Sequence, residues 1–153
     1  MRTTTHGTAG SRAMPSGRVL VRRAGAGIAG GLVGGLAFGI MMQLAGMMTM
    51  VAALVGSTAP AVGWTVHLLI SVFFGAAFGV LLGAKVTGPV SGVLLGVGYG
   101  AVLWVVDALI LMPARLGMPL FAINDMTINS LVGHLVFGLL LGAVVSLVLR
   151  SRA

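Results

Sequence analysis

Four polar side chains interrupt otherwise apolar stretches of the chain: Gln43, His67, Asp107 and His134. Polar and ionisable groups are expensive inside a membrane, and where they occur they often take part in function. Both histidines and Asp107 lie about five to seven residues from the same side of their segments, which is roughly 7–11 Å deep in a helix. We therefore predict that the four residues form one polar cluster, a binding or proton site, in the outer half of a helical bundle.

Three kinds of chemistry are open to this cluster. Histidine titrates near neutral pH, and an adjacent aspartate would orient it, as in intramembrane proton relays and transporters. Alternatively, His67 and His134 are two axial ligands of one b-type haem, because haem iron accepts protein ligands of this kind. The third possibility is a Cu(I) site on His67 and His134, since imidazole and thioether ligands suit that ion.

Methionine is concentrated near the same depth. Eight of the ten methionines fall in the outer half of the segments or in an outer loop: Met41, Met42, Met47, Met48, Met50, Met112, Met118 and Met126. Methionine is also an adaptable packing residue, so packing is the competing interpretation of this pattern.

The composition excludes several classes of protein. Of 153 residues, 58% are apolar and 7% are charged, whereas soluble domains carry about 25% charged residues. The absence of cysteine excludes disulfides, thiolate metal sites and cysteine nucleophiles. With two acidic residues and no catalytic motif, we expect no enzyme. Most of the net charge of +7 lies in the two tails, so we expect no nucleic-acid partner.

Four apolar segments must position the cluster. Each is long enough to cross a hydrocarbon core of about 30 Å, and they run over residues 25–54, 62–84, 88–112 and 127–149. The predicted fold is an all-α integral membrane protein, with a flexible basic tail over residues 1–23 and a transmembrane domain over residues 24–150. Eight of the nine Lys and Arg residues fall on one side, which places both termini in the cytoplasm.

Small residues recur every four positions in these segments. Residues four apart share a helix face, and small side chains there let helix backbones approach closely in lipid. We expect helix packing through ten glycines: Gly31, Gly35, Gly39, Gly75, Gly79, Gly92, Gly96, Gly100, Gly138 and Gly142. Gln43 continues the first of these rows, which is why we expect it in the interior.

The two halves of the chain match each other. A shift of 61 positions lays Gly31, Gly35 and Gly39 on the glycines of the third segment, and a shift of 67 lays His67 on His134. This pattern predicts a duplicated helical hairpin, with both copies in the same orientation and a pseudo-two-fold axis along the membrane normal.

Three stretches resemble a known group of proteins: TVHLLISVFFGAAFGV at residues 65–80, LILMPARLGMP at 109–119 and NSLVGHLVFG at 129–138. Over residues 62–145 the chain resembles uncharacterised bacterial inner-membrane proteins of the YagU type. The resemblance implies a bacterial plasma-membrane location and a similar series of spans. It also implies that His67 and His134 occupy the family's two histidine positions. The short first external loop and the Gly- and Met-rich first span depart from that pattern, and the family brings no substrate.

These observations favour a small multi-pass protein in the lipid bilayer, either transporter- or channel-like or an accessory subunit of a membrane complex. The alternative is a protein that binds haem or Cu(I). A third class is a structural assembly module, in which the small-residue stripes hold a homo-oligomer or a partner. Transport requires a cavity that reaches His67 and Asp107, whereas a fully packed bundle would argue against it.

Overall fold

The computed structural model describes residues 16–150, and all of its regular elements are helical. They are α1 (Gly17–Leu44), α2 (Met48–Ala53), α3 (Pro60–Leu82), α4 (Pro89–Leu103), the π-helix η1 (Trp104–Leu111), α5 (Met112–Leu116) and α6 (Asp125–Arg150). Four continuous helical segments are long and apolar enough to cross a membrane: Gly17–Leu44, Pro60–Leu82, Pro89–Leu116 and Asp125–Arg150. The predicted all-α class with four membrane-spanning helices is therefore confirmed.

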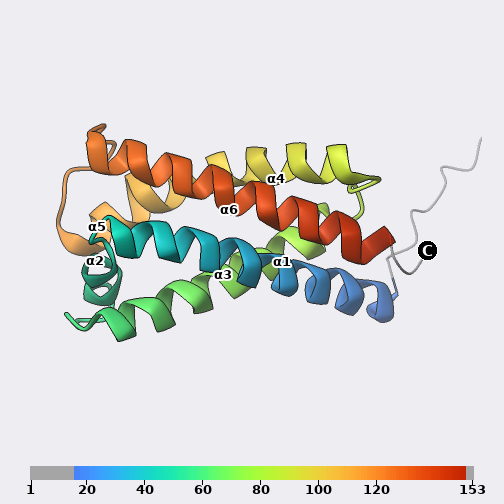
Figure 1. The fold of residues 1–153 in the computed structure, drawn as a ribbon, viewed down its shortest axis with the longest axis horizontal. Helices are drawn as coiled ribbons and strands as arrows, with labels where there is room; N and C mark the ends of the chain where they lie inside the picture. The colour runs from blue at the N-terminus through green and yellow to red at the C-terminus, as the bar shows by residue number, and fades with distance from the viewer. Residues whose placement is uncertain (1–15, 151–153) are drawn as a thin grey trace, which may run out of the picture.

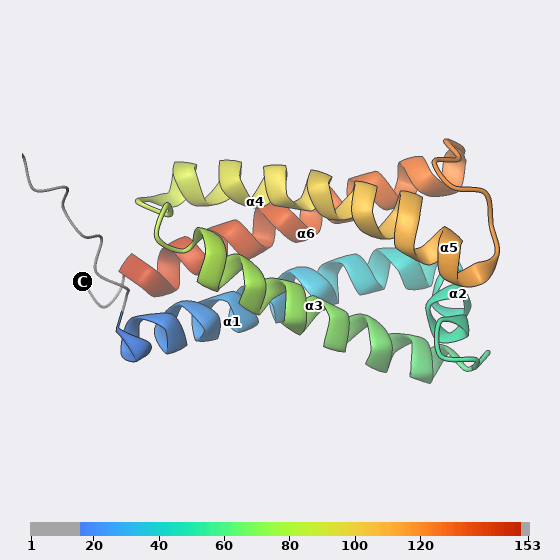
Figure 2. The ribbon, with the colours of Figure 1, turned by 180° about the vertical axis from the view of Figure 1, so that it is seen from behind.

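Helix α1 is central in the arrangement. It packs against α3 on one side and α6 on another, and α6 packs in turn against α4. Helices α3 and α4 are joined by a short loop but barely touch one another, and they diverge toward the end of the bundle where α2 and α5 lie (Figures 1 and 2). The molecule thus consists of two tight helix pairs, α1–α3 and α4–α6, that meet along α1 and α6.

Each helix pair is held together by a glycine seam. A Cβ atom added at Gly31 would collide with the backbone of Ser71 and Gly75, and one at Gly96 would collide with the backbone of Gly138. Lipid gives no hydrophobic driving force between helices, so backbone packing of this kind supplies the association. All ten predicted packing glycines lie in the two seams: Gly31, Gly35, Gly39, Gly75 and Gly79 between α1 and α3, and Gly92, Gly96, Gly100, Gly138 and Gly142 between α4 and α6.

A second glycine face on α1 contacts α6. A Cβ atom at Gly30 would meet Leu141, and one at Gly34 would meet Phe137. On α4, the positions 61 residues further along carry Ser91 and Leu95 instead. Helix α4 therefore cannot approach α3 as α1 approaches α6. A pseudo-two-fold axis would make the α3–α4 contact equivalent to the α1–α6 contact. The predicted pseudo-two-fold arrangement of the four helices is therefore wrong, because α3 and α4 barely touch.

The first span differs from its predicted bounds of 25–54. Helix α1 begins at Gly17, so residues 17–23 of the predicted tail are helical; residues 1–15 lie outside the described part of the chain. The helix ends at Leu44 because Gly46 takes a left-handed φ of 70°. The N–H groups of Gly46 and Met47 then bond back to the carbonyls of Gln43 and Met42, which is the Schellman pattern. Helix α2 follows as a separate element at the end of the bundle.

The third span is longer than predicted. Pro113 was expected to end it near Met112, but the helical segment continues to Leu116. Residues Trp104–Leu111 form a π-helix, and the N–H of Met112 bonds to the carbonyl of Asp107. Pro113 then falls in the first turn of α5, where a missing N–H is tolerated.

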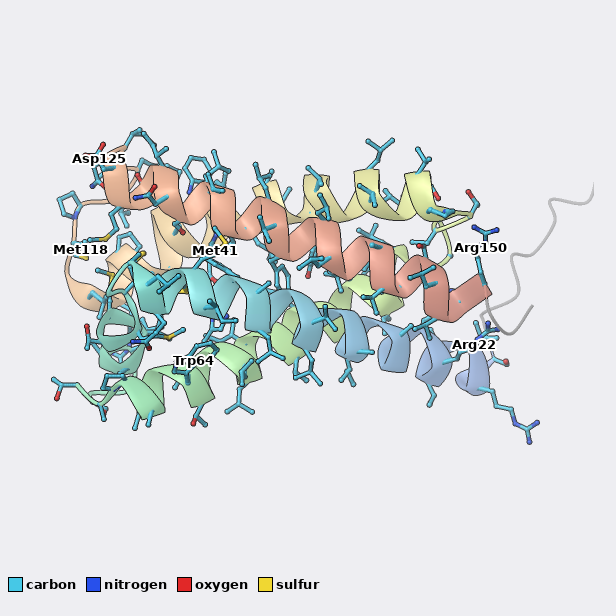
Figure 3. The ribbon with its side chains drawn as sticks, in the orientation of Figure 1. Arg22, Met41, Trp64, Met118, Asp125 and Arg150 are labelled. Atoms are coloured by element: carbon cyan, nitrogen blue, oxygen red, sulfur yellow. The ribbon has the colours of Figure 1, made fainter. Side chains whose placement is uncertain are left out.

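Both ends of the described chain lie at the same end of the bundle. Arg22 and Arg150 lie at one end, and Met118 and Asp125 at the other (Figure 3). The Arg22 guanidinium donates a hydrogen bond of 2.6 Å to the carbonyl of Leu149. This bond satisfies one of the carbonyls left open at the end of α6 and places a cation at the negative end of its dipole.

The seams predict opposite outcomes for two neighbouring glycines of α4. Gly96→Leu forces a side chain into the backbone of α6, so we expect it to lower the free energy of unfolding by about 3 kcal/mol or more. Gly98 has no atom within 4 Å of its Cβ position, so Gly98→Leu should be neutral or stabilising, because leucine favours helix over glycine. Thermal unfolding in detergent measures both. Equal destabilisation by the two changes would contradict the seam.

Candidate binding site

A cavity of about 70 Å³ lies between the two helix pairs in the half of the bundle that contains α2 and α5. We call it the central cavity. His67, Asp107 and His134 all line it, so the structure brings together three of the four residues of the predicted cluster. The volume is sufficient for a few water molecules or a small ligand. Most of the other residues in the wall are apolar, including Phe38, Ile70, Phe74, Leu103 and Phe137.

His67 is held from α1 by a backbone bond. Its Nε2 lies 2.9 Å from the carbonyl oxygen of Gly35. A carbonyl only accepts hydrogen bonds, so Nε2 carries the hydrogen and Nδ1 of the neutral ring keeps a lone pair. The row of glycines on α1 leaves room for this bond, because a Cβ atom at Gly39, one turn further along, would lie 3.1 Å from Cδ2 of His67.

His134 is held within its own helix. Its Nδ1 lies 2.8 Å from the carbonyl oxygen of Ser130, one turn earlier, and 3.3 Å from the Ser130 hydroxyl. Nδ1 therefore carries the hydrogen, and Nε2 of the neutral ring keeps the lone pair. The ring of Phe38 contacts both imidazoles, with centroid distances of 5.4 Å to His67 and 4.8 Å to His134. One phenylalanine of α1 thus links the two histidines across the helix pairs.

The carboxyl group of Asp107 has no hydrogen bond or ion pair with any residue in the described part of the chain. It is half-buried and lies in the middle of the π-helix Trp104–Leu111. Short π-helical turns occur often at functional sites. An acid without a partner at this position is costly in a membrane. It is therefore the strongest single indication of function in the molecule.

Gln43 does not join the cavity. Its side chain is exposed, and its Oε1 accepts a bond of 3.0 Å from Nε1 of Trp64. The prediction that Gln43 faces the interior is wrong, because each step of four residues turns the row by about 40° around a helix of 3.6 residues per turn. By Gln43 the row has left the seam, and the amide instead joins α1 to α3.

Two aromatic residues near the cavity are structural ties. The Tyr99 hydroxyl donates a 3.0 Å bond to the carbonyl of Phe74, across the gap between α4 and α3. Trp104 donates a 2.7 Å bond from Nε1 to the carbonyl of Thr127, near the start of α6. The first bond joins α4 to α3 and the second joins η1 to α6, so both connect helices that contribute residues to the central cavity.

Sequence reasoning missed several lining residues. Phe38 and Phe74 carry no signal in a sequence where most residues are apolar, and Ser130 was not among the predicted site residues. The methionines of the wall were noted, but their positions were not predicted.

The donor set limits what the cavity can hold. Among residues 16–150, no three histidine or acidic side chains come together as a metal-binding group. A haem bound between His67 and His134 would have to displace Phe38 and separate the helix pairs, because that ring already contacts both imidazoles. The structure therefore offers a site for a small ligand and no ready slot for a flat macrocycle.

Comparisons with protein-family models, curated proteins and solved structures give no match for this chain. The resemblance to YagU-type proteins therefore stays a prediction, and the function must be argued from the site.

Asp107 and Asp125, the two acids of the chain, should respond differently to removal. Because Asp107 has no partner to lose and lies in an apolar wall, we expect Asp107→Leu to raise the free energy of unfolding by about 1 kcal/mol or more. Asp125 lies exposed in the first turn of α6, where a negative charge is favourable, so Asp125→Leu should bring no gain. Thermal unfolding in detergent at neutral pH compares them, and a loss of stability in Asp107→Leu would reveal a structural role for this carboxyl.

Proposed function

We propose that this protein is a small multi-pass membrane protein of the transporter- or channel-like class, with the central cavity as its site for a proton or a small solute. The observation that carries the proposal is the unpartnered carboxyl of Asp107, which lines the same cavity as His67 and His134. Intramembrane acids and histidines that face an internal cavity are typical of ion and solute pathways. The proposed role is binding and passage rather than catalysis.

A path from the outer end supports this function. A second cavity, of about 170 Å³, lies beside the loop after α5 and is lined by Pro113, Pro119 and Asn124, among others. We call it the outer vestibule. Four residues line both the vestibule and the central cavity: Met47, Ala108, Met112 and Ser130. A solute in the vestibule is therefore one layer of side chains away from Asp107.

We also infer that the two helix pairs arose by duplication, and the seams support this inference. Shifts of 61 and 67 positions carry the first seam onto the second, contact by contact: Gly31 with Gly75 onto Gly92 with Gly142, Gly35 with Ser71 onto Gly96 with Gly138, and Gly39 with His67 onto Gly100 with His134. The same shift carries Phe137 and Leu141, which fill the α1–α6 contact, onto Ile70 and Phe74. Those two residues line the central cavity. In this interpretation the α3–α4 interface is the second copy of the α1–α6 interface, and the cavity lies there because the second copy is not closed by helix contact.

The proposed orientation places the chain termini in the cytoplasm of a bacterial plasma membrane. Arg22 and Arg150 lie at the end of the bundle that holds both described termini (Figure 3). Arg18 and Arg23 lie in the first two turns of α1, and Lys85 lies in the loop that joins α3 to α4. Basic residues concentrate on the cytoplasmic side of membrane proteins. The central cavity and the vestibule then face the periplasmic half.

The assembly-module alternative is less well supported. It requires glycine faces that are free to bind a partner, but the glycine rows of α1, α3, α4 and α6 are filled by contacts within the chain. A site is needed to explain Asp107, and packing alone does not supply one.

The proposal predicts that water reaches the central cavity from outside. The chain has no cysteine, so single cysteines can be labelled without a background. Ser130→Cys lies on the cavity and the vestibule, and we expect a membrane-impermeant thiol reagent to modify it in right-side-out vesicles. Ser146→Cys is the matched control, because Ser146 is 1% exposed and lines neither cavity; it should stay unmodified.

The readout is the mass of the intact protein after labelling. Modification of Ser130→Cys at a rate at least tenfold above that of Ser146→Cys is the expected result. An unreactive Ser130→Cys in a folded protein would mean a dry bundle, and the transport proposal would then be abandoned.

A further inference from the structure

Methionine side chains surround the route from the outer end to the central cavity. A third cavity, of about 370 Å³, lies between the end of α1 and the start of α6, and we call it the side cleft. Seven of the eight outer methionines line the central cavity, the outer vestibule or the side cleft: Met41, Met42, Met47, Met50, Met112, Met118 and Met126. Met47 lines all three. This arrangement places methionine residues along the walls of all three cavities.

The eighth outer methionine, Met48, differs from the other seven in that it borders no cavity, whereas Met42 shares the buried core with it and also lines the central cavity. Met48 is 1% exposed, belongs to the hydrophobic core and lines none of the three cavities. Met48 is therefore the reference for a methionine that serves packing alone. Met47 and Met112 pack against the core, but they also border both the central cavity and the outer vestibule. Part of each side chain therefore faces open volume.

The chemistry of the donors points to a soft cation. Thioether and imidazole ligands select Cu(I) over hard ions such as Mg²⁺ and Ca²⁺. The lone pairs at Nδ1 of His67 and Nε2 of His134 are not used in any hydrogen bond between described residues. No three histidine or acidic groups in residues 16–150 form a metal site by themselves, so a complete site here needs sulfur ligands.

The charge of the cavity selects a monovalent ion. Thioethers and neutral imidazoles carry no charge, and Asp107 is the one acid among the lining residues. An unpaired charge is expensive in a low-dielectric site, and a single positive charge beside the Asp107 carboxylate makes the site neutral. A divalent ion would leave one charge uncompensated.

We propose that the central cavity binds a soft monovalent metal ion of the Cu(I) class, which reaches His67, His134 and Asp107 through the methionines of the outer vestibule. Met42, Met47 and Met112 are the sulfur donors that line the cavity itself. This inference rests on the proposed function, since it names the substrate class of the same cavity.

Silver(I) tests the site, because it shares the ligand preferences and charge of Cu(I) and is not oxidised in air. We would titrate the purified full chain in detergent with Ag(I) by calorimetry and count bound silver by elemental analysis. The wild type should bind silver at a saturable site, and the double variant Met47→Leu/Met112→Leu should bind at least tenfold more weakly at that site. Leucine keeps the apolar volume and removes the sulfur.

Met48→Leu is the matched control and should bind silver as the wild type does. Thermal unfolding must show that both variants are folded. The inference is overturned if the wild type binds no silver, or if the double variant binds it as tightly as Met48→Leu.

The two proposals fail separately. If Ser130→Cys is labelled from outside but the wild type binds no silver, the cavity is a solute site and the metal inference is wrong. If Ser130→Cys is not labelled and no silver binds, both proposals are wrong.

Discussion

The structure depends on the approach of helix backbones at glycine, and on the fact that one helix does this on two faces. Helix α1 presents one glycine row to α3 and a second, through Gly30 and Gly34, to α6. In lipid, apolar burial does not drive helices together, so close van der Waals packing has to do so. The two glycine faces of α1 fix α3 and α6 as its neighbours, and the seam between α4 and α6 adds α4, which gives the order α3, α1, α6, α4. The positions of all later residues in the bundle follow from this central helix.

The site is a consequence of the same constraint. Each glycine seam draws α3 toward α1 and α4 toward α6, and α3 and α4 make little contact with one another. The central cavity lies in the space between α3 and η1, where Ile70, Phe74 and Asp107 line it. The glycine rows also determine the chemistry inside it. His67 bonds to a main-chain carbonyl of α1 where the glycine row leaves room for its ring beside Gly39, and this bond decides which imidazole nitrogen keeps its lone pair. Packing and reactivity therefore have a common origin.

The sequence predicts the helices, the seams and most of the cluster. Apolar length predicts four spans, four-residue spacing predicts the packing glycines, and counting residues to equal depth brings His67, His134 and Asp107 together. The wrong predictions concern the direction in which a side chain faces around its helix and the local backbone conformation. Gln43 was assigned to the interior because a four-residue row drifts only slightly per step, and the drift accumulates. The end of α1 was recoverable, since Ala45-Gly46 is a helix-stop signal. The π-helix around Asp107 was not, because no residue pattern distinguishes it from an α-helix.

The divergence of α3 from α4 has a mechanical consequence. Each helix pair is locked internally by its glycine seam, so the width of the cavity changes only when one pair rotates as a rigid body against the other. Helix α3 has 23 residues and is about 34 Å long, so a rotation of about 5° about its C-terminal end displaces the far end by about 3 Å. That is roughly the diameter of a water molecule. The short loop at Lys85 is then the hinge of this rotation. The hydrogen bond between the Tyr99 hydroxyl and the Phe74 carbonyl limits how far α3 can move away from α4.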